Sequence, residues 1–489
     1  MSFRRREVDD CHNTVDPGLK KSEFFRPRLG SQGKHGSIRQ QVHWRYLIAW
    51  LCLWVCLIQY YEVSVVKRAM KRCQWSNWEE WPETATPHHM AVLADPQIMD
   101  AHSYPGRPWI ANYFTQQVVD NYHARNWKYM HHILDPHSTF FLGDLFDGGR
   151  RWNDSDWMQE YKRFNQIFPK KPNRLTVMSL PGNHDIGFGD TVIPESWARF
   201  STYFGDPSSK WDVGNHTIVL LDTISLSDSQ NEAISAVPRE FLDRFDESPR
   251  STPRVLMTHV PLWRDPNKQL CGAKRESQKP FPMAKGEQYQ TVIDWGLSQE
   301  VLQKIEPSLV LSGDDHDYCH IEHTYLSDRG STRADEITVK SCAMNMGISR
   351  PAIQLLSLYN PDLLSTSKDT YHTNICYLPD PYKALRMYVY TYVSTILFLF
   401  WIIFLPKSFN KVLESAMLRG SREFTHVLPI ATKKHGLKAT QEDVDDLLAV
   451  NGNRKIRRFV MNVTVMTFMI FWSSRCTIRK AEIKTTQSC

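Results

Sequence analysis

The stretch TFFLGDLFDGG at residues 139–149 decides the expected fold, because a short apolar run of β-forming residues ends abruptly in glycine and aspartate. Residues 109–132 lie between this run and an earlier one, and they have the apolar spacing of a helix. Continuous apolar strands separated by helices predict a layered α/β domain that displays polar side chains at its strand ends. The same kind of run recurs at MAVLADPQ (90–97), TVMSLPGNHD (176–185), RVLMTHVP (254–261) and LVLSGDDHD (309–317).

The polar residues at these strand ends have the chemistry of a two-metal hydrolytic centre. Hard divalent cations favour Asp and Asn oxygens, and imidazole suits Mn, Fe and Zn. One carboxylate can bridge two metals about 3.5–4 Å apart. Gly143, Gly182 and Gly313 would permit the tight turns that bring side chains from separate strands together.

Five ordered blocks carry a more specific resemblance. They are Asp95-x-Gln97, GDLFDGG (143–149), GNHD (182–185), His259 and GDDH (313–316). In this order the blocks resemble the signature of the calcineurin-like metallophosphoesterases. The resemblance implies an αββα sandwich, hydrolysis of phosphoester bonds and a pair of bound divalent metal ions.

Carried over block by block, the resemblance implies roles for individual residues. Asp144 would bridge the two metals, and a hydroxide activated by them would attack phosphorus in line. His184 would act as a general acid or stabilise charge at the leaving group, oriented by Asp185. The implied metal ligands are Asp95, Gln97, Asp144, Asn183, His259, Asp314 and His316.

Two of these ligands depart from the family pattern, which usually has histidine at the positions of Gln97 and Asp314. Both substitutes offer oxygen donors where nitrogen is usual, so we expect a harder site that prefers Mn2+ to Zn2+. Asp147 is interpreted as a residue behind the ligands or a helix N-cap. Arg150 is interpreted as an exposed arginine rather than a contact to the substrate phosphate.

Within that family, the blocks most closely resemble the fungal Cdc-one-type proteins, which are manganese-dependent membrane proteins of the endoplasmic reticulum (ER). The resemblance extends through residues 103–108 and 259–271. These proteins are related to the mammalian post-GPI-attachment phosphodiesterase. The resemblance implies removal of ethanolamine phosphate from a mannose of the glycosylphosphatidylinositol (GPI) glycan, on GPI-anchored proteins or the GPI lipid. Two alternatives stay open: a lumenal phosphomonoesterase or protein phosphatase of the same fold, and a catalytically silent scaffold.

Three apolar segments predict attachment to a membrane. Residues 46–66 and 387–406 have the length and composition of spanning helices. Residues 459–474 are only marginally long enough, and they could span the membrane or lie at its surface. The mean hydropathy of -0.44 averages these segments with a polar domain, so it does not exclude a membrane protein.

Basic flanks set the expected orientation, because Lys and Arg concentrate on the cytosolic side of membrane proteins. They predict a cytosolic tail (1–45), a lumenal catalytic domain (67–386), a basic cytosolic loop (407–458) and a C-terminal tail (475–489). The expected location is the ER membrane, with cycling to the Golgi as an option. Against this orientation, four basic residues fall at the start of the lumenal segment: Lys67, Arg68, Lys71 and Arg72.

The net charge of +6 is attributed to the membrane flanks, so membrane lipids rather than nucleic acid are the expected contacts. Asn153 and Asn215 begin glycosylation sequons, which are compatible with a lumenal domain and a glycoprotein. One or two disulfides could form among the cysteines of that segment and leave one thiol, but the spacing does not pair them. These cysteines are Cys73, Cys271, Cys319, Cys342 and Cys376.

Overall fold

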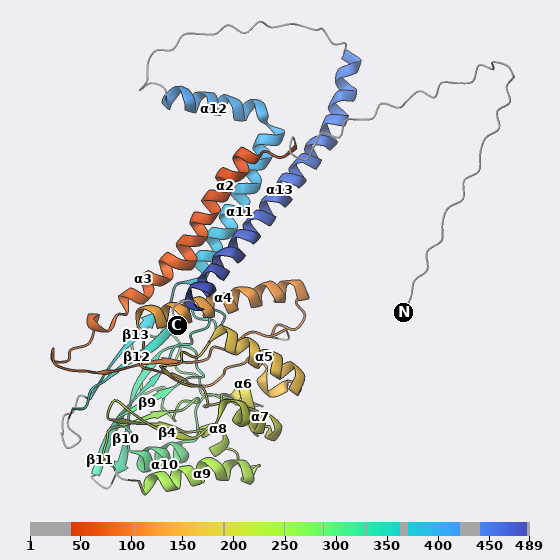
Figure 1. Ribbon diagram of the computed structural model, residues 1–489. Coiled ribbons are helices and arrows are strands. Elements are labelled where there is room, and N and C mark those ends of the chain that lie inside the picture. Colours follow the sequence, from red (N-terminus) through yellow and green to blue (C-terminus); the bar gives the residue numbers. More distant parts are fainter. Residues whose placement is uncertain are drawn as a thin grey trace, which may run out of the picture.

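The computed structural model describes residues 41–486, except 102, 189–190, 249, 287, 328–329, 362–369 and 421–440. The chain forms an α/β domain and a stalk of long helices that leaves one side of it (Figure 1). Almost all of the predicted N-terminal tail, residues 1–40, lies outside the described residues.

One half of the domain is a five-stranded sheet whose middle strands are parallel. β1 pairs in parallel with β2, and β2 with β3, whereas β12 and β13 are antiparallel additions at the other edge. In spatial order the strands are β13 (Tyr371–Tyr377), β12 (Ala352–Leu358), β1 (His88–Leu93), β2 (Ser138–Phe141) and β3 (Leu175–Val177).

The other half is a six-stranded sheet, again with a parallel centre. β5, β6, β9 and β11 are parallel neighbours, and β10 and β4 pair antiparallel at the two edges. Its order is β10 (Cys319–Ser327), β11 (Gly330–Thr338), β9 (Leu309–Ser312), β6 (Arg254–Met257), β5 (His216–Leu220) and β4 (Ser209–Val213). A small hairpin pairs β7 (Lys285–Gly286) with β8 (Tyr289–Gln290).

The two sheets pack face to face, and the side-chain alternation along each strand separates two cores. Met90 and Val92 of β1 point into the core between the sheets together with Ile218 of β5. Ala91 and Leu93 point to the opposite face, where helices cover the sheet.

Helices cover both outer faces. α4 (Trp109–Ile133) and α5 (Asp154–Ile167) lie on the first sheet, where Phe141 contacts the rings of Trp127 and Phe164. α9 (Glu232–Asp246) and α10 (Trp295–Ile305) lie on the second, where Arg254 of β6 stacks over Phe245. The predictions of a layered α/β domain and of a helix at 109–132 are therefore confirmed. Shorter helices are η2 (Trp75–Asn77), η3 (Gly149–Arg151), α6 (Asn183–Ile186), α7 (Pro194–Phe204) and α8 (Thr223–Leu226).

Two stalk helices are long and apolar enough to cross a membrane. The first is continuous from Trp44 to Arg72 and consists of α2 (Trp44–Gln59), the π-helical η1 (Tyr60–Ser64) and α3 (Val65–Arg72). The second is α11 (Pro381–Phe404). They contain most of the segments expected to span at 46–66 and 387–406.

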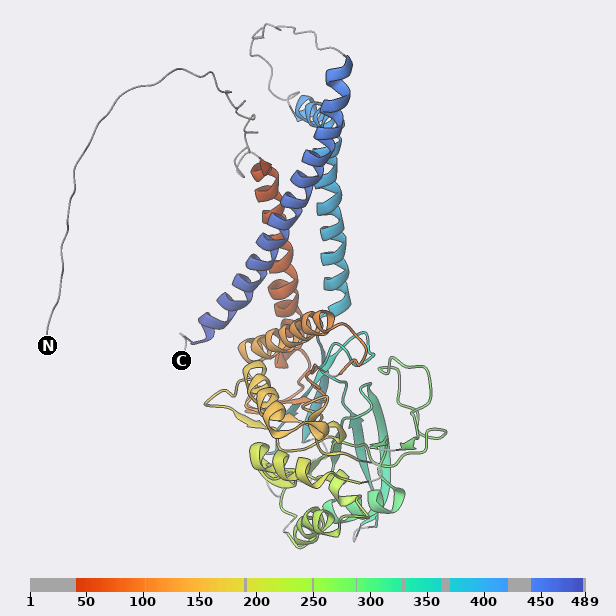
Figure 2. The same cartoon turned by 90° about the vertical axis from the view of Figure 1, so that its right-hand side faces the viewer.

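The third apolar segment, 459–474, belongs to the 46-residue helix α13 (Gln441–Thr486). The His43 N–H donates to Asn462 Oδ1 at 2.9 Å, and the hydroxyls of Tyr392 and Thr467 are 3.0 Å apart. These contacts join α13 to the chain just before α2 and to α11, so the segment lies along the other stalk helices rather than across their ends (Figure 2).

The part of the predicted basic loop that is described is helical. Residues 406–420 form α12 (Pro406–Gly420), and α13 begins at Gln441.

Two disulfides join segments that are distant in the chain. Cys73, just after α3, pairs with Cys376 of β13, and Cys271 pairs with Cys319 at the start of β10. Cys342 is buried and free, so the expectation of up to two disulfides and one remaining thiol is confirmed.

Candidate metal centre

The strand ends bring the predicted ligands to one edge of the stacked sheets. Asp95 follows β1, Asp144 follows β2, and Asn183 opens α6 after β3. In the second sheet, His259 and Asp314 follow the parallel strands β6 and β9. Because the carboxyl ends of parallel strands lie at the same edge, residues far apart in the chain converge there.

Three of these residues form a compact, buried cluster. Asp95, Asp144 and His259 have ligand atoms that all lie within 4.8 Å of one another. His259 Nε2 lies 3.5 Å from Asp144 Oδ1, 3.6 Å from Asp314 Oδ1 and 3.3 Å from Asn183 Oδ1. Asp95 Oδ1 lies 3.8 Å from Nδ1 of the same ring, so five of the seven predicted ligands, His259 included, meet around one imidazole.

A second hydrogen bond fixes the orientation of that imidazole. His259 Nδ1 donates to the Leu142 carbonyl oxygen at 2.6 Å. In the neutral ring, the Nε2 atom that faces the carboxylates then has a free lone pair, which is the usual arrangement of a metal-binding histidine.

The backbone of the site is held in an unfavourable conformation. Among the described residues, nine that are not glycine have a positive φ, and five of these are predicted ligands. Such a backbone is costly for a residue with a Cβ, and it persists at functional sites where surrounding structure enforces it. The five are Asp95 (48°), Gln97 (31°), Asp144 (50°), Asp314 (66°) and His316 (65°).

Gly182 permits the closest approach in the site. A Cβ on Gly182 would lie 2.0 Å from Asp144 Oδ1 and 2.3 Å from the Asp144 nitrogen. Only glycine therefore lets the GNHD turn pack against the aspartate expected to bridge the metals.

The charges in the cluster favour a cation. Burial, with the neighbouring carboxylates of Asp144 and Asp314, raises the pKa of Asp95 well above its usual value. Burial disfavours the charged imidazole, yet the carboxylates, Asp144 foremost, raise the pKa of His259 to about 10. Asp95 Oδ2 is buried and accepts no hydrogen bond from any described residue. A divalent cation fits this donor set, because it neutralises the carboxylates and occupies the unpaired oxygen.

Gln97 and His316 have different surroundings. The Gln97 amide donates to Asp144 Oδ2 at 2.7 Å, so in this structure it orients that carboxylate through its nitrogen. His316 lies close enough for the charges of Asp314 and Asp144 to act on it, although burial lowers its pKa. Their roles as ligands stay predictions.

Asp185 does not orient His184, contrary to the expectation. Its carboxylate accepts three backbone N–H bonds, from Gly182, Leu145 and Phe146, and so ties the GNHD turn to the loop after β2. His184 Nδ1 instead donates to the Asp147 carbonyl oxygen at 2.6 Å. Asp147, interpreted from the sequence as a supporting residue, therefore holds the imidazole.

A cavity of about 570 Å³ adjoins the cluster through His184. Arg150 lines it and donates from Nη1 to the Asn183 carbonyl oxygen at 2.8 Å, so it is partly buried rather than exposed as expected. Its other lining residues are Asp100, Ser103, Pro105, Asp147, Gly148, Arg151, Trp152, Asn153 and Asp156.

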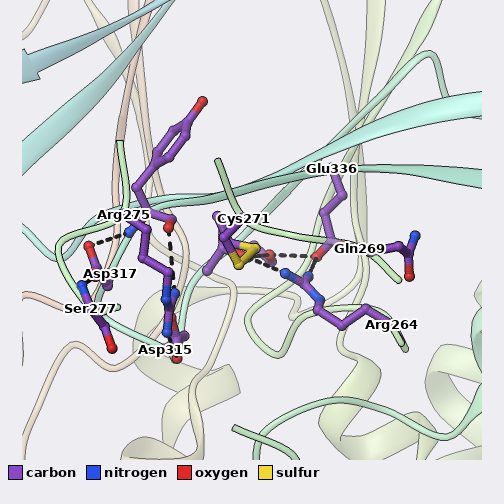
Figure 3. The surroundings of a disulfide bond; sticks show 12 residues. Arg264, Gln269, Cys271, Arg275, Ser277, Asp315, Asp317 and Glu336 are labelled. Atoms are coloured by element: carbon purple, nitrogen blue, oxygen red, sulfur yellow. Dashed lines mark hydrogen bonds and ion pairs between the residues drawn. A yellow bond between two sulfur atoms is a disulfide. The ribbon is translucent and has the colours of Figure 1, made fainter. Parts of the chain in front are cut away.

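Two ion pairs hold the GDDH block in place, and the sequence did not predict either of them. Arg275 binds Asp315, with Nη2 at 3.2 Å from Oδ1, close to the disulfide of Cys271 (Figure 3). Lys340 Nζ binds Asp317 Oδ1 at 2.8 Å. Arg275 and Lys340 have no motif around them, so only folding reveals that they hold the chain on either side of His316.

Comparison with known proteins agrees with this geometry. The sequence model of the calcineurin-like phosphoesterases matches residues 88–318. The chain is 57% identical to cell division control protein 1 of Saccharomyces cerevisiae over 442 residues, which cover 88% of this chain and 89% of that protein.

More distant similarity is found in vertebrates. Metallophosphoesterase 1 of Mus musculus is 28% identical over 280 residues, covering 52% of this chain and 65% of that protein. The Xenopus laevis protein of the same name is 25% identical over 311 residues, covering 58% and 70%. The chain belongs to the calcineurin-like phosphoesterase family and is a metal-dependent hydrolase of phosphoester bonds.

Proposed function

We propose that this protein is a membrane-anchored phosphodiesterase of the ER that removes ethanolamine phosphate from a mannose of the GPI glycan. The buried Asp95–Asp144–His259 cluster is the observation that carries the catalytic part of the proposal. The substrate is supported by the sequence blocks that resemble the fungal Cdc-one-type proteins and by the chemistry of the adjoining cavity.

Two divalent cations, which we propose to be Mn2+, would be held by the ligands predicted from the sequence. When bound, the cations supply activation of water and neutralisation of charge on the phosphoryl group. The oxygen-rich donor set supports Mn2+ over Zn2+, because Gln97 and Asp314 stand where the family usually has imidazole.

The chain's own residues bind the substrate and manage the proton. His184 Nδ1 is committed to the Asp147 carbonyl, so Nε2 is the atom that can deliver a proton to the leaving oxygen. Arg150 lines the same cavity, where its guanidinium can bind the non-bridging oxygens of the phosphate.

The cavity beside His184 suits the cationic ethanolamine, which stays esterified to the phosphate while the mannose oxygen leaves. The side chains of Asp100, Asp147, Asp156 and Trp152 all line it. Carboxylates and an indole attract an ammonium group such as that of ethanolamine, and the carboxylates can also accept hydrogen bonds from sugar hydroxyls.

A lumenal position of the domain is supported by its two disulfides, which are typical of oxidising compartments. Asn153, the start of one sequon, is exposed, although its Nδ2 donates to Asp156 Oδ2 at 2.8 Å. The apolar helices Trp44–Arg72 and Pro381–Phe404 support an anchor in the membrane that contains the proposed substrate.

The decisive experiment is mass spectrometry of GPI glycans from a deletion strain that carries either the wild-type chain or Asp144→Asn. We expect one ethanolamine phosphate to remain on the glycan with Asp144→Asn and to be absent with the wild type. Identical glycans in both strains would reject this substrate. Full complementation by Asp144→Asn would favour the silent scaffold.

The phosphomonoesterase alternative is tested with purified enzyme. We expect bis-p-nitrophenyl phosphate to be hydrolysed faster than the mono ester. The reverse preference would favour a phosphomonoesterase or protein phosphatase.

A further inference from the structure

A second cavity, of about 600 Å³, lies where the stalk meets the domain. It is lined by the end of the first stalk helix (η1 and α3), by β13 and by the first turn of α11. None of the predicted metal ligands lines it, so it is separate from the cavity beside His184. We call it the junction cavity.

The junction cavity is lined by unpaired cations. Arg68, Arg72, Arg350 and Lys383 all line it, and none makes an ion pair with another residue in the described part of the chain. Arg125 also lines it, but its charge is used in an ion pair with Glu62.

The acidic side chain that lines the junction cavity is already committed. Asp380 caps α11 by accepting hydrogen bonds from the backbone N–H groups of Tyr382 and Lys383, at 2.9 and 3.1 Å. It also lies 3.7 Å from Arg386. The cavity therefore keeps a net positive charge for an anion.

The walls of the junction cavity are fixed by the fold. The Val65 N–H donates to the Tyr60 carbonyl, five residues back, in the π-helical turn η1, a feature often found at functional sites. The Cys73–Cys376 disulfide ties the end of α3 to β13. Arg350 lies over the Tyr377 ring at 4.3 Å, which holds this guanidinium at the wall.

An exposed apolar face of α4 adjoins this region. Glu62 of the first stalk helix contacts Asn121 and Arg125, so that face of α4 points toward the stalk. Phe114 and Val118 lie seven residues earlier, two helical turns away on the same face, yet are 54% and 39% exposed. Figures 1 and 2 show that α4 lies at the level where the stalk helices leave the domain. The exposed Phe114 and Val118 therefore give this level of the molecule an apolar surface.

We propose that the junction cavity binds the phosphate group of a phosphate ester, and that a membrane phospholipid supplies it. Guanidinium groups recognise phosphate oxygens in pairs, and the headgroup of a membrane phospholipid carries such a phosphate. Tyrosines at the membrane interface, here Tyr60 and Tyr61, are typical of such a position. The choice of a lipid source rests on the membrane anchoring in the proposed function. The site also gives a role to Arg68 and Arg72, two of the four basic residues whose position at the start of the lumenal segment argues against the expected orientation.

The first stalk helix provides a matched control. α3 carries two basic pairs, each one turn apart: Arg68 with Arg72, which line the cavity, and Lys67 with Lys71, which do not. The double variants Arg68→Gln/Arg72→Gln and Lys67→Gln/Lys71→Gln remove the same charge from the same helix. Neither changes a residue of the metal centre, so both should hydrolyse bis-p-nitrophenyl phosphate as the wild type does.

The test measures binding of three probes to the full chain in detergent: dioctanoyl phosphatidic acid, dioctanoyl phosphatidylcholine and inorganic phosphate. We expect phosphatidic acid to bind the wild type and Lys67→Gln/Lys71→Gln equally, and Arg68→Gln/Arg72→Gln about 10-fold or more weakly. Phosphate bound at the metal centre contributes equally to all three proteins and cancels.

Each outcome decides the inference. Weak binding of inorganic phosphate beside tight binding of phosphatidic acid supports a lipid ligand. Equally tight binding of both, lost only in Arg68→Gln/Arg72→Gln, keeps the site and assigns it to soluble phosphate. Equal effects of the two double variants, or no effect of either, overturn the site. If the wild type hydrolysed no phosphodiester but still lost phosphatidic acid binding only in Arg68→Gln/Arg72→Gln, the proposed function would be refuted and the phosphate site would be retained.

Discussion

The metal centre and the junction cavity carry opposite charge and differ in burial. Asp95, Asp144 and His259 are at most 1% exposed, whereas Arg68 and Lys383 are exposed. A buried carboxylate cluster interacts strongly and requires a cation, whereas exposed cations are screened by water and salt, so each of them contributes less to binding an anion. Burial therefore decides how much activity or binding a substitution at each site should cost.

The largest expected effect is at the metal centre. Asp144→Asn removes the charge of the carboxylate expected to bridge the metals, and we expect kcat/KM for bis-p-nitrophenyl phosphate to fall by about 10³-fold or more. Binding of phosphatidic acid at the junction cavity should be unchanged. If Asp144→Asn lost both turnover and binding of phosphatidic acid, the metal centre and the junction cavity would be coupled rather than independent sites.

A smaller loss is expected from Gly182→Ala, because the added methyl would meet Asp144 Oδ1 and displace it. A misplacement of this kind can cost about 10²-fold in kcat/KM. The control is Gly296→Ala in α10, where a Cβ would meet nothing within 4 Å. Turnover and metal affinity near wild type in Gly182→Ala would contradict the close packing of the GNHD turn.

The ion pair of Arg275 with Asp315, behind the GDDH block, should have a smaller effect on the metal centre than Asp144 or Gly182. Arg275→Gln leaves the buried Asp315 unpaired next to Asp314, and we expect about a 10-fold loss of metal affinity, measured by calorimetry. The double variant Arg275→Gln/Asp315→Asn should recover part of it, because no charge is then stranded. Arg333→Gln is the control, since its pair with Glu322 is exposed. Equal losses in both single variants would remove any special role of Arg275.

The smallest effect concerns metal preference. Gln97→His restores the imidazole that the family usually has at this position, so the ratio of turnover with Zn2+ to turnover with Mn2+ should rise a few-fold. The ratio is measured after removal and readdition of each metal, which cancels any general loss from the missing bond to Asp144. An unchanged ratio would mean that residue 97 does not set the preference.

The sequence by itself determined the layered α/β class and the converging strand-end residues. It could do so because these signals are local: each apolar run and its closing Asp, Asn or His lie within a few residues, and parallel strands place their carboxyl ends together. The same locality identified the apolar helices at 46–66 and 387–406.

Only the tertiary structure decided which residues support that site. The sequence assigned the orientation of His184 to the neighbouring Asp185, whereas folding gives that role to Asp147 and uses Asp185 to cap a turn. The physical reason is that the hydrogen-bond partner of a side chain depends on which loops meet in the folded protein. Adjacency in the chain does not determine that partner.

The junction cavity depended entirely on folding. Arg68 and Arg350 are far apart in the chain, and they line one cavity because the Cys73–Cys376 disulfide and the packing of α3 against the domain bring their segments together. From the sequence, Arg68 was an unexplained basic flank. Its place in the wall of a cationic cavity follows from contacts between distant segments, which no local pattern encodes.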